Sequence, residues 1–167
     1  MDLQMSMKID GVIGSSKCTQ HKGWSEVYSW NWGMSSNRKS VQVTNENKTS
    51  LNEISIVKPI SIDSPDIRLL FAKGENISNV EFSITPVIAK REAAKKLLHM
   101  KLEGVMIKSI VSGGSIDDDF FKEHITLLFD KIQFEYSHGG PRSADGTIVF
   151  EDHDFAWDVL ENKEWIQ

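Results

Sequence analysis

Apolar and polar residues alternate along most of this chain. Met5, Met7 and Ile9 are separated by polar residues close to the N-terminus. A period of two is typical of a β-strand that buries one face. The same alternation recurs over residues 54–62, 80–88, 98–107 and 125–136. The pattern therefore predicts a mainly β protein built from antiparallel strands.

The apolar positions change parity at two places. Leu102 and Val105 lie on either side of Gly104, where a bulge fits naturally. A second change occurs at Asp130 and Lys131. Strands that change parity usually bend around the corner of a barrel or a sandwich. We therefore expect a β-barrel or β-sandwich.

One segment has the spacing of a short helix. Asp63 is a suitable capping residue, and Pro65 follows in the first turn. Ile67 and Leu70 recur at helical spacing, and Gly74 supplies a stop. The sequence predicts a single short α-helix here.

Three segments interrupt the alternation. Residues 35–50 and 137–146 are polar or rich in glycine and are predicted to be loops. Residues 89–96 are charged and predicted to connect two strands. No repeat or linker divides the chain, so residues 1–167 are expected to form one domain.

Residues 24–35 (WSEVYSWNWGMS) carry the densest group of aromatic residues. If this segment is one strand, alternate residues share a face. An aromatic face of this size must be covered, since each ring buries roughly 150–250 Å². The expected core aromatics are Trp24, Tyr28, Trp30, Trp32 and Trp157. The opposite face is small and mostly polar, and it includes Ser29, Asn31 and Ser35.

Charge and composition narrow the classes of partner. The 167 residues have a formal net charge of -5, whereas a nucleic-acid binder usually carries positive charge. No apolar run approaches the roughly 20 residues that span a bilayer. The first residues lack the basic and apolar regions of a secretory signal. We expect no nucleic-acid partner and no membrane insertion. We expect a protein made in the cytoplasm that would leave the cell without a cleaved signal.

Candidate catalytic and metal-binding groups are sparse. His153 lies beside Asp152 and Asp154, but alternation puts the histidine on the opposite face of a strand from them. Residues 117–119 are three consecutive aspartates without the spacing of a calcium loop. Cys18 is a single cysteine and has little nearby to activate it. We therefore expect no catalytic residue, no metal, no cofactor and no enzymatic activity.

Several segments, taken in order, resemble the Hcp (haemolysin-coregulated protein) family, which forms the tube of type VI secretion systems. Each segment alone is unspecific, but the ordered set covers most of the chain. The similar segments are MKIDGVIGSS (7–16), HKGWSEVYSWNWGMS (21–35), SIVKPISIDSPDIRLLFAKG (55–74), MKLEGVMIKSIVSGG (100–114), HITLLFDKIQFEY (124–136) and FAWDVLEN (155–162).

The resemblance implies a structural protein that assembles with itself. Subunits would form homo-hexameric rings, and stacked rings would form a tube that carries and chaperones effectors and is expelled into target cells. Its further partners would be the spike, the sheath and the effectors. Ser29, Asn31 and Ser35 would line the lumen. Contacts between rings or subunits would use Asn37, Arg38, Lys39, Val41 and Val43.

Other interpretations remain open at this point. A monomeric β-sandwich could bind carbohydrate through the face of Trp24, Tyr28, Trp30 and Trp32, because exposed aromatic rings stack on sugars. A small metal-dependent hydrolase is a weaker alternative. A tube protein of a related phage-tail-like injection particle is a variant of the first interpretation.

Overall fold

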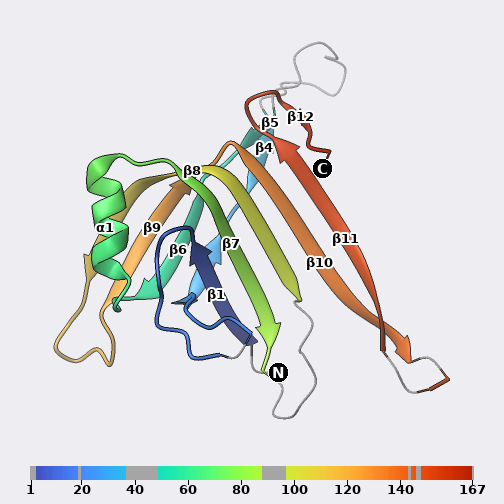
Figure 1. Ribbon diagram of the computed structural model, residues 1–167, viewed down its shortest axis with the longest axis horizontal. Helices are drawn as coiled ribbons and strands as arrows, with labels where there is room; N and C mark the ends of the chain where they lie inside the picture. The colour runs from blue at the N-terminus through green and yellow to red at the C-terminus, as the bar shows by residue number, and fades with distance from the viewer. Residues whose placement is uncertain are drawn as a thin grey trace.

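The computed structural model describes residues 3–18, 20–36, 49–87, 97–142, 144–145 and 148–166. Over these residues the chain is mainly β with one α-helix, as the alternation predicts (Figure 1). The helix is α1 (Ser64–Lys73). The strands are β1 (Leu3–Ile9), β2 (Ser25–Val27), β3 (Ser29–Asn31), β4 (Met34–Ser36), β5 (Thr49–Leu51), β6 (Ile54–Pro59), β7 (Ile77–Pro86), β8 (Leu98–Gly113), β9 (Lys122–Leu128), β10 (Lys131–Arg142), β11 (Ile148–Asp158) and β12 (Lys163–Glu164).

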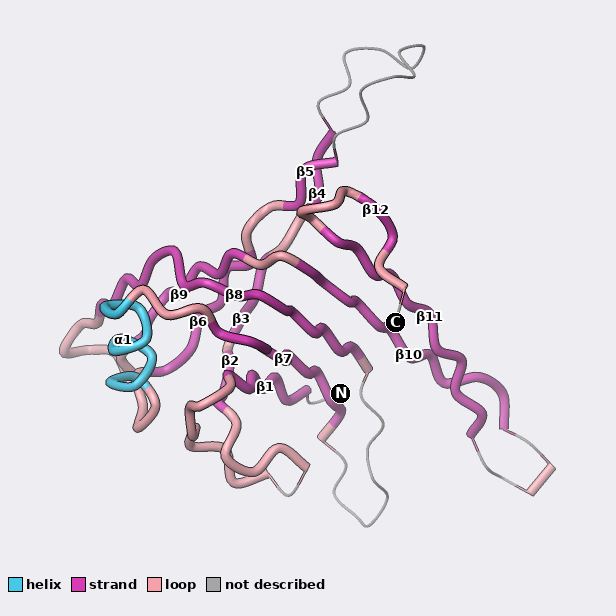
Figure 2. Tube along the Cα trace, turned by 45° about the horizontal axis from the view of Figure 1, so that its top comes forward, coloured by secondary structure: helices cyan, strands magenta, loops and turns pink. Residues whose placement is uncertain are grey.

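Two antiparallel sheets share strand β8. The long sheet has the order β12-β11-β10-β8-β7-β1-β2, and the short sheet has the order β3-β6-β9-β8. The first part of β8 pairs with β7 and β10, and its second part pairs with β9. Strands β4 and β5 form a separate ribbon that projects from the body (Figure 2). Because β8 crosses from one sheet to the other, the sheets wrap around a common core.

The crossing in β8 is made at Gly104. Its φ of 62° lies in the left-handed region, and a Cβ at this position would collide with the Asp130 carboxylate. The Asp130 amide donates to the carbonyls of Glu103 and Gly104 at 3.0 and 3.2 Å. Leu102 and Val105 are both buried on either side of the glycine. Both predicted parity changes are therefore confirmed, and they meet at one corner.

The core lies between the two sheets and under α1. Ile67 is the apolar residue of the helix that is fully buried. The helix begins and ends where predicted: Asp63 precedes it, a proline is in its first turn, and Gly74 ends it in the left-handed conformation. The strands contribute most of the buried apolar side chains: Met7, Ile9, Val27, Ile54, Ile56, Ile77, Val80, Phe82, Ile84, Leu98, Met100, Leu102, Val105, Ile107, Ile125, Leu127 and Ile132.

Residues 24–35 do not form the single strand that the sequence predicts. β2 pairs with β1 in the long sheet, whereas β3 pairs with β6 in the short sheet. Between them, the Tyr28 amide donates to the Val57 carbonyl at 2.8 Å, and Ser29 also lies opposite Val57. Tyr28 and Ser29 therefore both lie opposite Val57, as in a β-bulge. The extra residue changes which alternate side chains point inward, so Val27 and Trp30 both face the core.

The segment predicted as a loop at residues 137–146 is largely strand. β10 continues to Arg142 and pairs with β11 as far as Ile148. The glycine and proline residues coincide with a register shift between Gly139 and Arg142, so cross-strand pairing overrides the local turn signal. The predicted connection at residues 89–96 lies outside the described residues. In the described part of the chain, no helix is long and apolar enough to span a membrane.

Replacing Gly104 with alanine should destabilise the subunit by about 1–2 kcal/mol or more, because an L-residue is strained at this φ and its Cβ meets Asp130. The matched control is Gly113→Ala in the same strand, where an added Cβ meets nothing within 4 Å. Urea unfolding of both variants measures the difference. Equal midpoints for the two variants would contradict this account of the corner.

Candidate functional site

Three ionisable side chains are completely buried at one end of the core. Lys58, Asp63 and Glu123 each have 0% side-chain exposure. The Lys58 ammonium lies 2.8 Å from Asp63 Oδ1 and 2.9 Å from Glu123 Oε1. Arg68 joins them from the surface, with Nη1 at 2.8 Å from Glu123 Oε2. These four residues are called the ion cluster below, and their formal charges cancel.

Lys58 and Glu123 are buried because they occupy inward-facing positions of their strands. Lys58 has the inward parity of Ile54 and Ile56 in β6, and Glu123 has the inward parity of the buried residues of β9. Lys58 and Glu123 are direct cross-strand partners. Sequence analysis missed this cluster. The signal available was a lysine and a glutamate at inward positions of two alternating strands.

Serine hydroxyls add hydrogen bonds to the buried charges. Ser64 Oγ donates to Glu123 Oε1 at 2.7 Å, and the hydroxyls of Ser25 and Ser61 donate to the Asp63 carboxylate. The Lys58 ammonium also donates to the Pro59 carbonyl at 2.8 Å. A buried ion pair offsets its desolvation only when such bonds are made. The cluster thereby joins β2, β6, α1 and β9.

Asp63 precedes the helix but does not cap it with its side chain. Burial is the largest influence on this carboxyl and opposes its ionisation. The hydrogen bonds from Lys58, Ser25 and Ser61, together with the Lys58 charge, outweigh burial and lower the pKa of Asp63. The carboxylate is ionised and enclosed at neutral pH, so it serves stability and offers no surface for a substrate.

The outward face of the short sheet carries a row of small polar side chains, flanked by the exposed apolar residues Met106, Val111 and Leu128. Ser29 and Asn31 are both exposed on β3. The register places Asn31 beside Ser55, Ser55 beside Thr126, and Thr126 beside Ser109, so one polar row crosses all four strands. Sequence analysis did not identify the last three members, because pairing between distant strands brings them together. Ser35 lies apart, in the β4–β5 ribbon.

The five predicted core aromatics take different positions. Trp30, Trp32 and Trp157 pack against the core, with Trp30 at 5.6 Å from Phe82 between ring centroids. Trp24 is half-buried and meets His21 edge-on at 4.5 Å. The prediction for Tyr28 was wrong: the reversal between β2 and β3 leaves its side chain 38% exposed. The aromatic residues therefore do not form the single exposed platform that the carbohydrate-binding alternative requires.

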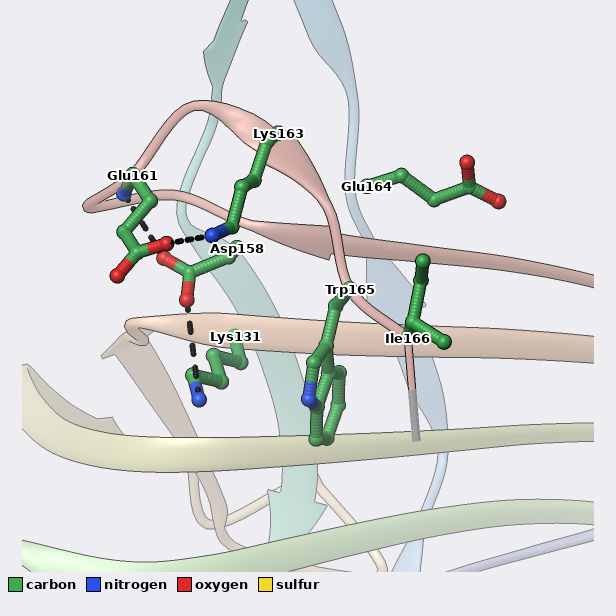
Figure 3. A pocket seen from close by; sticks show the side chains of 7 residues that line it. All are labelled: Lys131, Asp158, Glu161, Lys163, Glu164, Trp165 and Ile166. Atoms are coloured by element: carbon green, nitrogen blue, oxygen red, sulfur yellow. Dashed lines mark hydrogen bonds and ion pairs between the residues drawn. The ribbon is translucent and has the colours of Figure 1, made fainter.

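The C-terminal tail folds back along the edge of the long sheet. β12 pairs with β11, and the Trp165 amide donates to the Ala156 carbonyl at 3.1 Å. The Trp165 ring lies 5.8 and 5.4 Å from the ammonium groups of Lys101 and Lys131, which are cation–π distances. Figure 3 shows the open groove of about 410 Å³ beside this tail. Its lining is mostly charged and includes Asp158, Glu161, Lys163 and Glu164.

The remaining predicted positions carry little chemistry. Within the described residues, no group of three histidine, cysteine or acidic side chains is placed to hold a metal ion. Asp152 accepts a 2.7 Å hydrogen bond from the Ser137 hydroxyl. The predicted contact residues Asn37, Arg38, Lys39, Val41 and Val43 lie outside the described part of the chain.

Comparisons with known proteins agree with one another. The family model described as type VI secretion system effector, Hcp, matches residues 7–136. Protein hcp1 of Pseudomonas aeruginosa is 27% identical over 164 residues, which is 97% of this chain and 98% of the relative. A solved structure of a type six secretion system protein has a TM-score of 0.82 and 20% identity, covering 98% of this chain and 100% of the other. Hcp1 from Salmonella typhimurium has a TM-score of 0.73 and 21% identity, covering 99% and 100%.

Replacing Lys58 with methionine keeps most of the apolar stem and removes the ammonium from between the buried carboxylates of Asp63 and Glu123. We expect a loss of about 3–5 kcal/mol in the free energy of unfolding. The matched control is Lys108→Met, which breaks an exposed ion pair with Glu53 and should change stability little. Chemical denaturation measures both. Losses of similar size would contradict a stabilising role for the cluster.

The lowered pKa of Asp63 predicts the direction of an acid effect. Its native pKa is below the ordinary value of 3.8, so its contribution to stability is complete above that value and is lost as pH falls through the native pKa. The stability difference between the parent and Asp63→Asn should therefore shrink on acidification below about pH 4. Urea unfolding from pH 6 to pH 2.5 measures this difference. A constant difference would show that Asp63 does not act through its charge.

Proposed function

The chain belongs to the Hcp family of type VI secretion systems and is a subunit of the secretion tube, and we propose that the outward face of its short sheet lines the tube lumen. Family membership rests on the match over residues 7–136. Subunits of this family associate with themselves into rings. Cargo that passes through the stacked hexameric rings would meet this face of the subunit.

The polar row across the short sheet is the observation that carries this proposal. Asn31, Ser55, Thr126 and Ser109 are short and uncharged, and they follow one line across β3, β6, β9 and β8. Short hydroxyl and amide groups stay hydrated and offer no large apolar or charged anchor of the kind that holds a partner tightly. A lumen in which cargo moves along this row can carry effectors and still release them. Ser29 continues the same face, and we propose Ser35 as a further lumen residue on the adjoining ribbon.

A structural role also fits the chemistry of the rest of the subunit. The ion cluster is enclosed, and the groove beside Trp165 is open and mostly charged. Neither combines a reactive group with a shaped substrate pocket, as catalysis requires. We therefore propose that the protein acts as a structural carrier and has no enzymatic activity.

We further propose where the subunit meets other components. The β4–β5 ribbon, from which the chain continues into residues 37–43, projects from the body of the subunit (Figure 2). This position supports a ring contact by Asn37, Arg38, Lys39, Val41 and Val43. The spike, sheath and effector proteins are the remaining proposed partners. Assembly is proposed to take place in the cytoplasm, before the tube is expelled.

Thiol accessibility tests the lumen assignment. In a Cys18→Ser background, Asn31→Cys is compared with Lys8→Cys, which lies exposed on the outward face of the long sheet. A small maleimide should label both in assembled rings. A maleimide on a bulky polymer should label Asn31→Cys severalfold more slowly than Lys8→Cys, because the ring shields its lumen. In dissociated subunits the two rates should converge. Equal rates in intact rings would refute the assignment.

A further inference from the structure

A shallow pocket of about 350 Å³ lies at one end of the short sheet, where β8 leads through a loop into β9. Figure 1 shows this end of the two strands beside α1. The pocket is separate from the ion cluster and from the groove at the C-terminal tail. Its lining includes Val111, Gly113, Gly114, Asp118, Lys122 and His124.

The pairing register places the two basic side chains of the pocket on the outward face of the short sheet. His124 lies opposite Val57 of β6 and opposite Val111 of β8. Lys122 is the next outward residue of β9 and lies opposite Gly113. Because strand residues two apart share a face, both basic side chains lie on the same face as the polar row.

These basic side chains are available to bind an anion. Lys122 and His124 are both exposed, and neither has a side-chain partner within the described residues. The one carboxylate in the lining is held by its own loop, since Asp118 Oδ2 accepts a 2.8 Å hydrogen bond from the Ser115 amide. An anion that enters the pocket therefore meets two donors that are not already engaged.

An aliphatic surface adjoins the basic side chains. Val111 is 62% exposed, and Val57 is half-buried on the other side of His124. The space opposite Lys122 is open, because a Cβ added at Gly113 would meet nothing within 4 Å. A lysine stem lies readily along an apolar surface while its ammonium stays in water. The pocket therefore fits a carboxylate that has an aliphatic side chain beside it.

We propose that this pocket holds a carboxylate of the cargo polypeptide, from an acidic side chain or from a C-terminus, with an aliphatic neighbour against Val111. This inference rests on the proposed function, because it requires that the short sheet faces the lumen. Hydrogen bonds from Lys122 and His124 to the carboxylate are charge-assisted. Each contact is weak, because the pocket is open to solvent. Six copies in one ring act together on a single cargo molecule, so retention stays reversible without being negligible.

The charge on His124 sets the strength of this contact. The neighbouring strands place no ionisable group beside it on this face, since Val57 and Pro59 of β6 and Val111 and Gly113 of β8 are uncharged. The charged groups that remain are Lys122 on the same strand and Asp118 on the loop. A histidine side chain gains a proton as the pH falls through the range just below neutrality, whereas a peptide carboxylate stays ionised there. Binding should therefore tighten between pH 7.5 and pH 6.

A methyl NMR titration of intact rings tests the site. Rings with isotope-labelled valine methyl groups report on Val111, and Val149, 53% exposed on β11, is the matched reporter that should not shift. The probes are blocked peptides that differ only in one central residue, which is glutamate, glutamine or lysine between two valines. A glutamine peptide with a free C-terminal carboxylate separates the two sources of the anion. At pH 6 the glutamate peptide should bind about fivefold or more tightly than the blocked glutamine peptide.

Substitutions in the pocket give the second measurement. Lys122→Gln and His124→Gln should each weaken binding of the glutamate peptide by about threefold or more, and His124→Gln should also remove the gain at pH 6. Asp118→Asn keeps an acceptor for the Ser115 amide but removes a like charge, so it should tighten binding. Lys8→Gln removes the same charge from the outward face of the long sheet and should leave binding unchanged.

The outcomes separate this inference from the proposed function. Equal binding of the glutamate and blocked glutamine peptides, or tighter binding of the lysine peptide, would overturn the inference. The tube function would still stand if rings form and Asn31→Cys is shielded from the bulky maleimide. An unshielded Asn31→Cys in intact rings would overturn the lumen assignment, and the inference with it.

Discussion

The buried ammonium of Lys58 is the constraint on which the rest of the subunit depends. Its bonds to Asp63 and Glu123 fix the end of β6 against the start of α1 and against β9. The Ser25 hydroxyl extends the same network to β2. A shift of one residue in the pairing of β6 with β9 would turn Lys58 to the surface and leave both carboxylates buried without it. The network therefore selects one register, and that register also aligns the polar row on the opposite face of the short sheet.

The crossing of β8 at Gly104 gives the subunit two outward faces of different chemistry. The long sheet presents charged and polar contacts on its outward face, including a 3.2 Å hydrogen bond between Glu81 and His99 and a 3.0 Å ion pair between Lys101 and Glu103. The short sheet presents the small polar row that contains Asn31 and Ser55. A tube wall needs such a difference, because one side meets moving cargo and the other meets the surrounding machine. A single strand shared by both sheets holds the two faces at a fixed angle.

Local patterns in the sequence predict much of this fold, and pairing between distant strands decides the rest. The alternation of apolar residues predicts the strands, and Asp63, Pro65 and Gly74 predict both ends of the helix. The ion cluster was not predicted, because only the register of β6 and β9 brings Lys58 and Glu123 together. The exposure of Tyr28 follows from a change of sheet that alternation alone does not reveal. The sequence predicts a loop at residues 137–146 because this segment is rich in glycine and contains a proline. Pairing with β11 nevertheless keeps β10 extended as far as Arg142.

Closure of this chain into six-membered rings is what a tube subunit requires. Native mass spectrometry of the purified protein, with negative-stain electron microscopy of the same sample, tests it most directly. We expect ring-shaped particles and a mass of about 113 kDa for six chains of 18.9 kDa each. A monomer without ring-shaped particles, at concentrations where the chain is fully folded, would contradict it.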